Sequence, residues 1–338
     1  MPGRRLSDRQ KARILNLQDQ RRQRLDERAE QVLATCEVDQ PRHGLVVVRH
    51  GAELAVEDEA GQVWHCLARQ NMGHPVCGDR VVWQASGPDR GVVTAIQARA
   101  TVLARPDYSG RDKALAANLT QLVAILAPRP EPSTYLLDQY LAAAERLGVK
   151  ALIACNKTDL LDAPGRATLA SLLAPYERIG YPLIWLSLLD AQDLRPLAAR
   201  LAGETNILVG QSGVGKSSLV KALLPDLDIQ IGRLSLATGL GRHTTSTATC
   251  YHLPGGGHLI DSPGVRSFRL TLDGQADLEH GFRDIAPLIG HCRFANCHHD
   301  QEPGCALKEA VAAGELNPER LANFLHMSAT LERSNARH

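Results

Sequence analysis

The 338-residue sequence has few aromatic residues, no excess of either charge and no long apolar run. Lys and Arg number 38 and Asp and Glu number 37, a balance that excludes a uniformly cationic nucleic-acid binder. The longest apolar runs, such as 122–127, are far too short to cross a bilayer, and the N-terminus has no apolar signal segment. We therefore expect a cytoplasmic protein without a membrane partner, in which any basic surface is local.

The first thirty residues carry such a local excess. They contain nine Arg or Lys residues against five Asp or Glu residues, which makes 1–30 a basic N-terminal arm. A solvated helix with mixed charges would give the same pattern, because charged segments often have no partner. The rest of the sequence has to decide between the two interpretations.

Three further patterns predict a multidomain protein. Short β-rich runs broken by glycines in 31–100 are typical of a small β-barrel. An oligonucleotide-binding barrel (OB-fold) fits that length, although an SH3-like barrel or a purely structural β-domain would give similar spacing. Residues 101–278 alternate apolar strands with helical stretches, which predicts an α/β domain with a mostly parallel sheet. Residues 279–338 are helical and rich in His and Cys, which predicts a third, small domain.

A phosphate-binding loop (P-loop) lies between an apolar strand at 206–209 and a helical run at 218–224, the context that this motif requires. Glycines let the backbone wrap around phosphate, and the N–H groups at the helix N-terminus hold its charge. We expect Lys216 to reach the outer phosphates and the Ser217 hydroxyl to bind Mg²⁺. The motif consists of Gly210, Gln211, Ser212, Gly213, Val214, Gly215, Lys216, Ser217 and Ser218.

A second motif selects the base. Its residues are Asn156, Lys157, Thr158 and Asp159, and they follow the apolar strand 151–155. The Asp159 carboxylate can accept hydrogen bonds from the ring N–H and the amine of guanine, whereas adenine has no such pair of donors. Alone, the tetrapeptide would also suit a loop with a helix cap. Beside a P-loop, it predicts a guanine-nucleotide site for GTP and GDP.

Two segments after the P-loop resemble nucleotide-sensing switches. Asp261 ends a short strand and would hold Mg²⁺ through water, and the Gly264 N–H would sense the γ-phosphate. In the polar loop before them, either Thr244 or Thr245 would complete the shell of the metal.

The residue after Gly264 is Val265, where many GTPases have a glutamine that orients the attacking water. Valine cannot orient water, and we expect His243 to do so, as the catalytic residue. A histidine that only packs locally would fit equally well, and Arg242 or Arg266 would be available to neutralise transition-state charge. We expect slow hydrolysis by the isolated protein and acceleration by a partner that orders the loop.

The eight cysteines do not suit a disulfide framework in a reducing compartment, and three of them crowd between residues 292 and 305. With one histidine they form a closed tetrahedral ligand set, and His291 and His298 are rival ligands. We expect one structural Zn²⁺ that stabilises a domain too small to build a core, although incidental buried cysteines would be the alternative. The predicted ligands are Cys292, Cys297, His299 and Cys305.

The order of the motifs is circularly permuted. GTPases usually place the P-loop first and the base-reading motif last, but here the base reader precedes the P-loop by about fifty residues. The same sheet can form because strand pairing depends on neighbours in space. The Asp261 segment then leads directly into the His/Cys region, and we expect nucleotide state to move that region.

The permuted order, the run 241–245 and the Cys/His cluster resemble the RsgA (YjeQ) family of small-ribosomal-subunit biogenesis GTPases over nearly the whole chain. The resemblance implies an OB-fold barrel, a permuted P-loop GTPase and a C-terminal zinc domain. It also implies an enzyme that hydrolyses GTP, binds the small (30S) subunit and its 16S rRNA, and is stimulated by that subunit. We expect the protein to be a monomer. The nucleotide and zinc residues given above match the family's motifs, as does Val265. The last base-reading loop departs from them, because Ser187 is followed by leucine instead of alanine.

Two other functions remain as alternatives. A ribosome-associated RNA-binding scaffold with a non-hydrolysing nucleotide site would suit Val265, but Lys216, Ser217 and Asp261 are all present. A P-loop kinase or a metal-linked redox switch is opposed by Asp159 and by the lack of a resolving cysteine. Because aromatics make up only 4% of the residues, RNA affinity should depend on phosphate contacts and fall with salt.

Overall fold

The structure, a computed structural model, describes residues 40–51, 53–69, 72–106, 112–189, 194–238, 248–262 and 274–335. The predicted basic arm lies outside these residues. The chain forms two compact units, of which one comprises Met1–Arg99 and Asp228–Cys250 and the other Ala100–Leu227 and Tyr251–His338. Among the described helices, none combines the length and the apolar character that spanning a membrane needs. The domain boundaries predicted at residues 30, 100 and 278 stay predictions.

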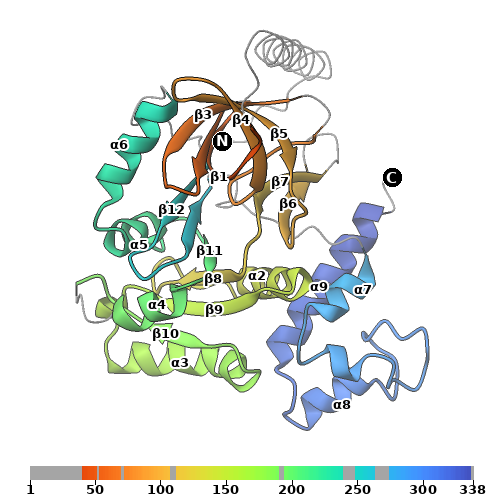
Figure 1. The fold of residues 1–338 in the computed structure, drawn as a ribbon. Helices are drawn as coiled ribbons and strands as arrows, with labels where there is room; N and C mark the ends of the chain where they lie inside the picture. Colours follow the sequence, from red (N-terminus) through yellow and green to blue (C-terminus); the bar gives the residue numbers. More distant parts are fainter. Residues whose placement is uncertain are drawn as a thin grey trace, which may run out of the picture. The chain divides into compact units, whose positions relative to one another are not determined.

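The first unit contains a closed five-stranded barrel (Figure 1), which confirms the predicted OB-fold. Its strand order is β1-β2-β3-β5-β4, and β4 pairs with β1 to close the ring. The pair β3 and β5 is parallel, and the other pairs are antiparallel. The strands are β1 (Arg42–His50), β2 (Glu53–Asp58), β3 (Val63–Ala68), β4 (Arg80–Gly87) and β5 (Arg90–Ile96), and helix α6 (Leu227–Thr238) lies almost wholly in the same unit.

The interior of the barrel is built around Trp83, which is fully buried. Two glycines make room for its ring: a Cβ on Gly91 would lie 2.7 Å from Trp83 Cε3, and one on Gly44 would lie 3.0 Å from Trp83 Nε1. Trp64 packs beside it, with the ring centroids 4.8 Å apart. The glycines that break the β-rich runs are therefore partly a packing requirement.

The second unit contains a parallel sheet in the order β10-β9-β8-β11-β13. All six residues of β8 are buried, as expected for a central parallel strand. The mostly parallel sheet predicted from the alternating pattern is confirmed. Its strands are β8 (Gln121–Leu126), β9 (Lys150–Cys155), β10 (Leu183–Trp185), β11 (Thr205–Val209) and β13 (His258–Asp261), and β12 (Ala248–His252) precedes β13.

Helices connect these strands, and two of them show why the sequence folds in this way. Helix α2 begins after Ser133, whose hydroxyl accepts the Leu136 N–H, and ends at Gly148 in the left-handed conformation. Helix α3 begins after Asp162, whose carboxylate accepts the Gly165 N–H. The helices are α2 (Thr134–Leu147), η1 (Thr158–Leu160), α3 (Ala163–Arg178), α4 (Leu194–Leu201) and α5 (Lys216–Leu223). Two further strands, β6 (Val102–Pro106) and β7 (Asp112–Ala117), pair with each other in a separate sheet.

The C-terminal segment is helical, as predicted, and it buries an apolar core. Phe282 and Phe324 meet edge to face with centroids 5.4 Å apart, and Ala142 of α2 belongs to the same cluster. The expectation that this region is too small to have a core is wrong, because every buried member of this core except Ala142 comes from the C-terminal segment itself. The helices are α7 (Gln275–His280), η4 (Ala286–Leu288), α8 (Ala306–Ala312) and α9 (Pro318–Asn335), which we call together the C-terminal helices.

Candidate nucleotide site and metal cluster

The carboxyl ends of the five parallel strands meet at one edge of the sheet, where ligands bind in open α/β folds. Strand β9 leads into Asn156, β11 leads into the P-loop at Gly210, and β13 ends at Asp261. Strand β10 ends two residues before Ser187. Parallel pairing therefore brings the predicted motifs together although they are far apart in the sequence.

The P-loop backbone has the conformation that its glycines allow. Gly213 and Gly215 have φ values of 86° and 95°, in the left-handed region. Gly210 passes so close to the Ile125 carbonyl oxygen that a Cβ would collide with it. The Lys216 ammonium lies over the loop and donates to the Gly210 and Gln211 carbonyl oxygens, at 2.6 and 2.7 Å. Such a loop can present backbone N–H groups and an ammonium group to a polyphosphate.

Asn156 and Lys157 join the base reader to the P-loop. The buried Asn156 amide donates to the Val214 carbonyl oxygen at 3.0 Å, and a Cβ on Gly215 would lie 2.5 Å from the same amide nitrogen. The backbone of Lys157 has the left-handed conformation, with φ of 59°. Its ammonium group donates to the Gly213 carbonyl oxygen at 2.6 Å. The two predicted motifs therefore form one connected structure.

Asp159, the predicted guanine reader, is held by Ser187. The Ser187 hydroxyl donates to Asp159 Oδ1 at 2.6 Å, and the Leu189 N–H donates to Ser187 Oγ at 3.2 Å. A carboxylate fixed in this way can face a pair of donors on a base. The departure of the loop sequence after Ser187 does not displace the serine from the base reader.

The carbonyl of Arg129 was not predicted as part of this site. It lies in the loop after β8 and accepts from the Lys157 ammonium at 3.4 Å. The adjacent Pro130 is close to the P-loop, because its Cδ would lie 3.6 Å from a Cβ on Gly213. A backbone carbonyl carries no residue signature, and only the three prolines at 128, 130 and 132 mark the loop in the sequence.

Of the predicted switch residues, the structure describes Asp261. It is the last residue of β13, which pairs with β11 through Ile260 and Ile207. Its role with Mg²⁺ stays a prediction. The other residues of this group lie outside the described residues: His243, Thr244, Thr245, Gly264, Val265, Arg242 and Arg266.

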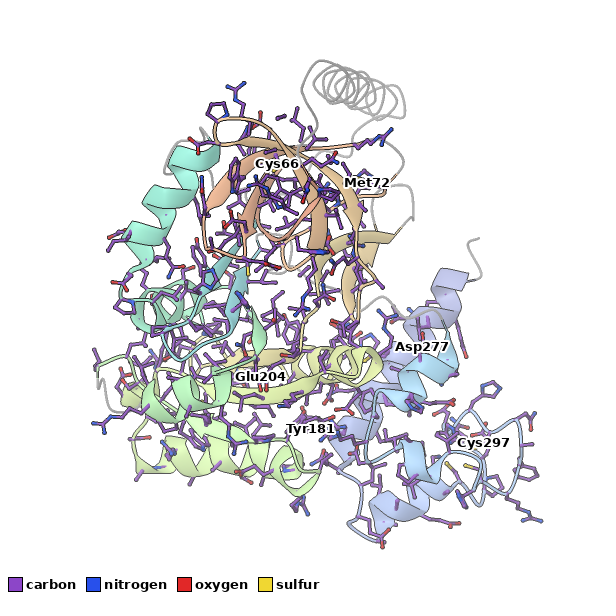
Figure 2. All side chains as sticks on the ribbon, viewed as in Figure 1. Cys66, Met72, Tyr181, Glu204, Asp277 and Cys297 are labelled. Carbon is purple, nitrogen blue, oxygen red and sulfur yellow. The ribbon has the colours of Figure 1, made fainter. Side chains whose placement is uncertain are left out.

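The four predicted metal ligands form one cluster, with their ligand atoms all within 4.8 Å of one another. His299 Nδ1 lies 3.4 Å from the sulfur of Cys292 and 3.4 Å from that of Cys305, and these two sulfurs are 4.0 Å apart. A tetrahedral ion with bonds of about 2.0–2.3 Å needs ligand separations of about 3.5–3.8 Å. The residues therefore fit a metal ion. Figure 2 shows Cys297 among these sulfur atoms.

The four predicted ligands, and not the rival histidines, form the cluster. The rival residues His291 and His298 are not members of the cluster found among the described residues. His299 is buried, and burial lowers its pKa, which keeps the ring neutral and able to bind a metal.

Glu302, which the sequence did not single out, organises the metal-binding loop. Its carboxylate accepts the backbone N–H groups of His298, Asp300 and Gln301 at 2.9, 3.0 and 3.1 Å. These hydrogen bonds, led by that of His298, lower the pKa of Glu302 to about 2. The loop that carries the predicted ligands is therefore shaped by hydrogen bonds to the Glu302 carboxylate.

Comparison with known proteins agrees with this geometry. Residues 96–271 match the family model described as RsgA GTPase. The curated small ribosomal subunit biogenesis GTPase RsgA of Azotobacter vinelandii is 45% identical, and that of Pseudomonas aeruginosa is 43% identical. Each alignment covers 98% of this chain and 98% of the relative.

Two solved structures are also similar. The crystal structure of YjeQ from Thermotoga maritima has a TM-score of 0.69 and 30% identity, covering 86% of this chain and 99% of that one. YloQ, described as a circularly permuted GTPase, has a TM-score of 0.68 and 28% identity, covering 87% and 96%. With a family model over half of its length and relatives that it matches almost end to end, the chain is a GTP hydrolase with permuted motif order and belongs to the RsgA GTPase family.

Proposed function

We propose that this GTPase binds the small ribosomal subunit through 16S rRNA, assists a late step of its maturation in the cytoplasm, and is stimulated by that subunit. The observation that carries the proposal is the assembled guanine site, in which Asn156 and Lys157 contact the P-loop while Ser187 holds Asp159. The near full-length relatives are named as biogenesis GTPases of that subunit, which supports the choice of partner.

In the proposed mechanism, Lys216 would neutralise the outer phosphates and Ser217 would bind Mg²⁺. Asp261 and either Thr244 or Thr245 would help to hold the same ion, and the Gly264 N–H would sense the γ-phosphate. Val265 has no group that could hold the attacking water, so His243 would orient it when the subunit is bound. This arrangement predicts slow turnover by the isolated protein and faster turnover on the subunit.

We propose that the metal in the Cys/His cluster is one structural Zn²⁺. Three thiolates and one imidazole favour zinc over the hard cations, which prefer oxygen ligands. With four ligands from the protein, a tetrahedral ion would have no open position for water. Zinc therefore supplies folding stability to the loop and no chemistry to GTP hydrolysis.

RNA contact through phosphates predicts binding that depends strongly on salt. We expect the protein to sediment with purified small subunits at low salt and to lose affinity about tenfold or more at moderate salt. An arm variant, Arg21→Gln with Arg22→Gln, should weaken binding further. The matched control, Arg195→Gln with Arg200→Gln on the exposed face of α4, changes the net charge equally and should bind as the wild type does.

Sedimentation of the protein with small and large subunits, across a salt series, makes this measurement. Equal binding to both subunits would contradict the proposed partner. Affinity that stays constant from low to moderate salt would remove the basic arm and phosphate contacts from the account.

A further inference from the structure

Helix α2 has one face toward the P-loop. Tyr140 is 3% exposed, and the backbone of Gly210, the first residue of the P-loop, lies close enough to its hydroxyl to oppose the rise that burial causes in its pKa. The loop before α2 approaches the same site, because Arg129 and Pro130 lie against Lys157 and Gly213. The position of α2 therefore bears on the shape of the phosphate-binding loop.

The opposite face of α2 is fixed to the C-terminal helices. With about 100° per residue, positions 138, 142 and 145 share one face of the helix, and Tyr140 lies about 200° from both 138 and 142. Ala142 packs against Gly281, where an added Cβ would lie 2.8 Å away, and Arg283 pairs with Glu145 at 2.7 Å. Figure 1 shows α2 beside α9 and α7.

The centre of this face is a buried network of charges. Arg320 of α9 donates to Asp138, and its remaining donors bind both oxygens of Asp284 at 2.7 and 2.6 Å. Asn323 donates to the other oxygen of Asp138 at 2.7 Å. Asp138 is 1% exposed and Arg320 2% exposed. A shift of α9 along α2 would leave these charges buried without partners, so the two helices have to move together.

We propose that α2 couples the metal-bearing C-terminal helices to the nucleotide site, with Tyr140 as a positioning residue for the P-loop. A contact that the C-terminal helices make with a partner would then change nucleotide affinity through Asp138 and Tyr140. By linkage, nucleotide binding would change the stability of the C-terminal helices equally. The inference rests on the proposed guanine site and not on the proposed ribosomal partner.

This route differs from the one that the motif order suggests. The sequence predicts that Asp261 and its switch move the C-terminal region, because they lead into it along the chain. The α2 route runs through side chains that are 182 to 185 residues apart in the sequence. The α2 route therefore joins the C-terminal helices to the P-loop, whereas the route along the chain joins them to Asp261.

The test compares full-length variants by the rate at which a fluorescent GDP dissociates. Tyr140→Phe removes only the hydroxyl beside Gly210, and we expect dissociation about fivefold faster, an effect of the size that one lost polar contact has. Asn323→Ala leaves the Arg320 pair intact and touches no part of the nucleotide site, yet we expect a rise of about threefold. The double variant should give less than the product of the two, because both act through α2.

Ser328→Ala is the control on the same helix, since its hydroxyl bonds Gln275 and not α2. It should leave the GDP rate unchanged. A purely structural role for the network would lower the melting temperature of Asn323→Ala without changing the GDP rate, and would overturn the proposal. A double variant that equals the product of the single effects would overturn it as well.

Hydrogen exchange of the wild type gives a second measurement that needs no variant. GDP should slow exchange of the amides in α9, and unchanged exchange there would contradict the coupling. A wild type that binds no guanine nucleotide would instead contradict the proposed function on which the inference rests.

Discussion

Asp159→Asn should lower the affinity for GTP and GDP by about 10²- to 10⁴-fold and abolish the preference for guanine. The carboxylate is expected to accept two hydrogen bonds from guanine, each worth about 1.5–3 kcal/mol because the acceptor is charged. The introduced amide keeps an oxygen for the Ser187 hydroxyl, so the loop should stay folded. Competition against a fluorescent GDP by GTP, ATP and XTP measures the effect.

Xanthine makes the experiment specific. It carries a carbonyl where guanine carries the amine, so the introduced amide can donate to it, and XTP should bind the variant better than the wild type. Asp162→Asn is the matched control, because Asp162 caps α3 three residues away and asparagine caps helices equally well. Unchanged guanine preference in Asp159→Asn would exclude Asp159 as the base reader.

Loss of the metal should have the second large effect. A zinc chelator should unfold the loop that carries the ligands and lower the free energy of unfolding of the C-terminal helices by several kcal/mol. We expect less than the roughly 10–16 kcal/mol of zinc-finger peptides, because Phe282, Phe324 and their neighbours supply a core that such peptides lack. Thermal unfolding with and without chelator, beside elemental analysis, checks both the ion and its contribution.

Two adjacent histidines provide the control. His299→Asn removes a ligand while keeping a residue that tolerates the left-handed backbone at φ of 63°. His298→Asn changes a side chain outside the cluster and should retain about one zinc per chain. Equal zinc content in the two variants would contradict the ligand set.

The sequence was most informative where the chemistry depends on particular residues at fixed spacing. The P-loop, the base reader and the metal ligands are each local in the sequence, and parallel strand pairing brings the first two of these motifs to one edge of the sheet. The closed strand order of the barrel was less certain, because short β-runs fit several barrels. The core around Trp83 gives the physical reason for Gly44 and Gly91, which the sequence showed only as breaks.

Contacts between distant segments could not be predicted. Asp138 and Arg320 are 182 residues apart and belong to no motif, so nothing in the sequence pairs them. The contact of the Arg129 carbonyl oxygen with Lys157 could not be predicted either, because every residue has a backbone carbonyl. Nothing in the sequence indicates that Ala142, from a helix of the α/β region, packs into the C-terminal core.

The central claim is that this guanine-specific GTPase acts on the small ribosomal subunit. Its most direct test is the rate of GTP and ATP hydrolysis by the purified protein, alone and with purified small or large subunits. We predict slow GTP hydrolysis by the protein alone, a strong increase with small subunits only, and no turnover of ATP. GTP turnover that neither subunit changes would contradict the proposed partner, and equal turnover of ATP would contradict the guanine site.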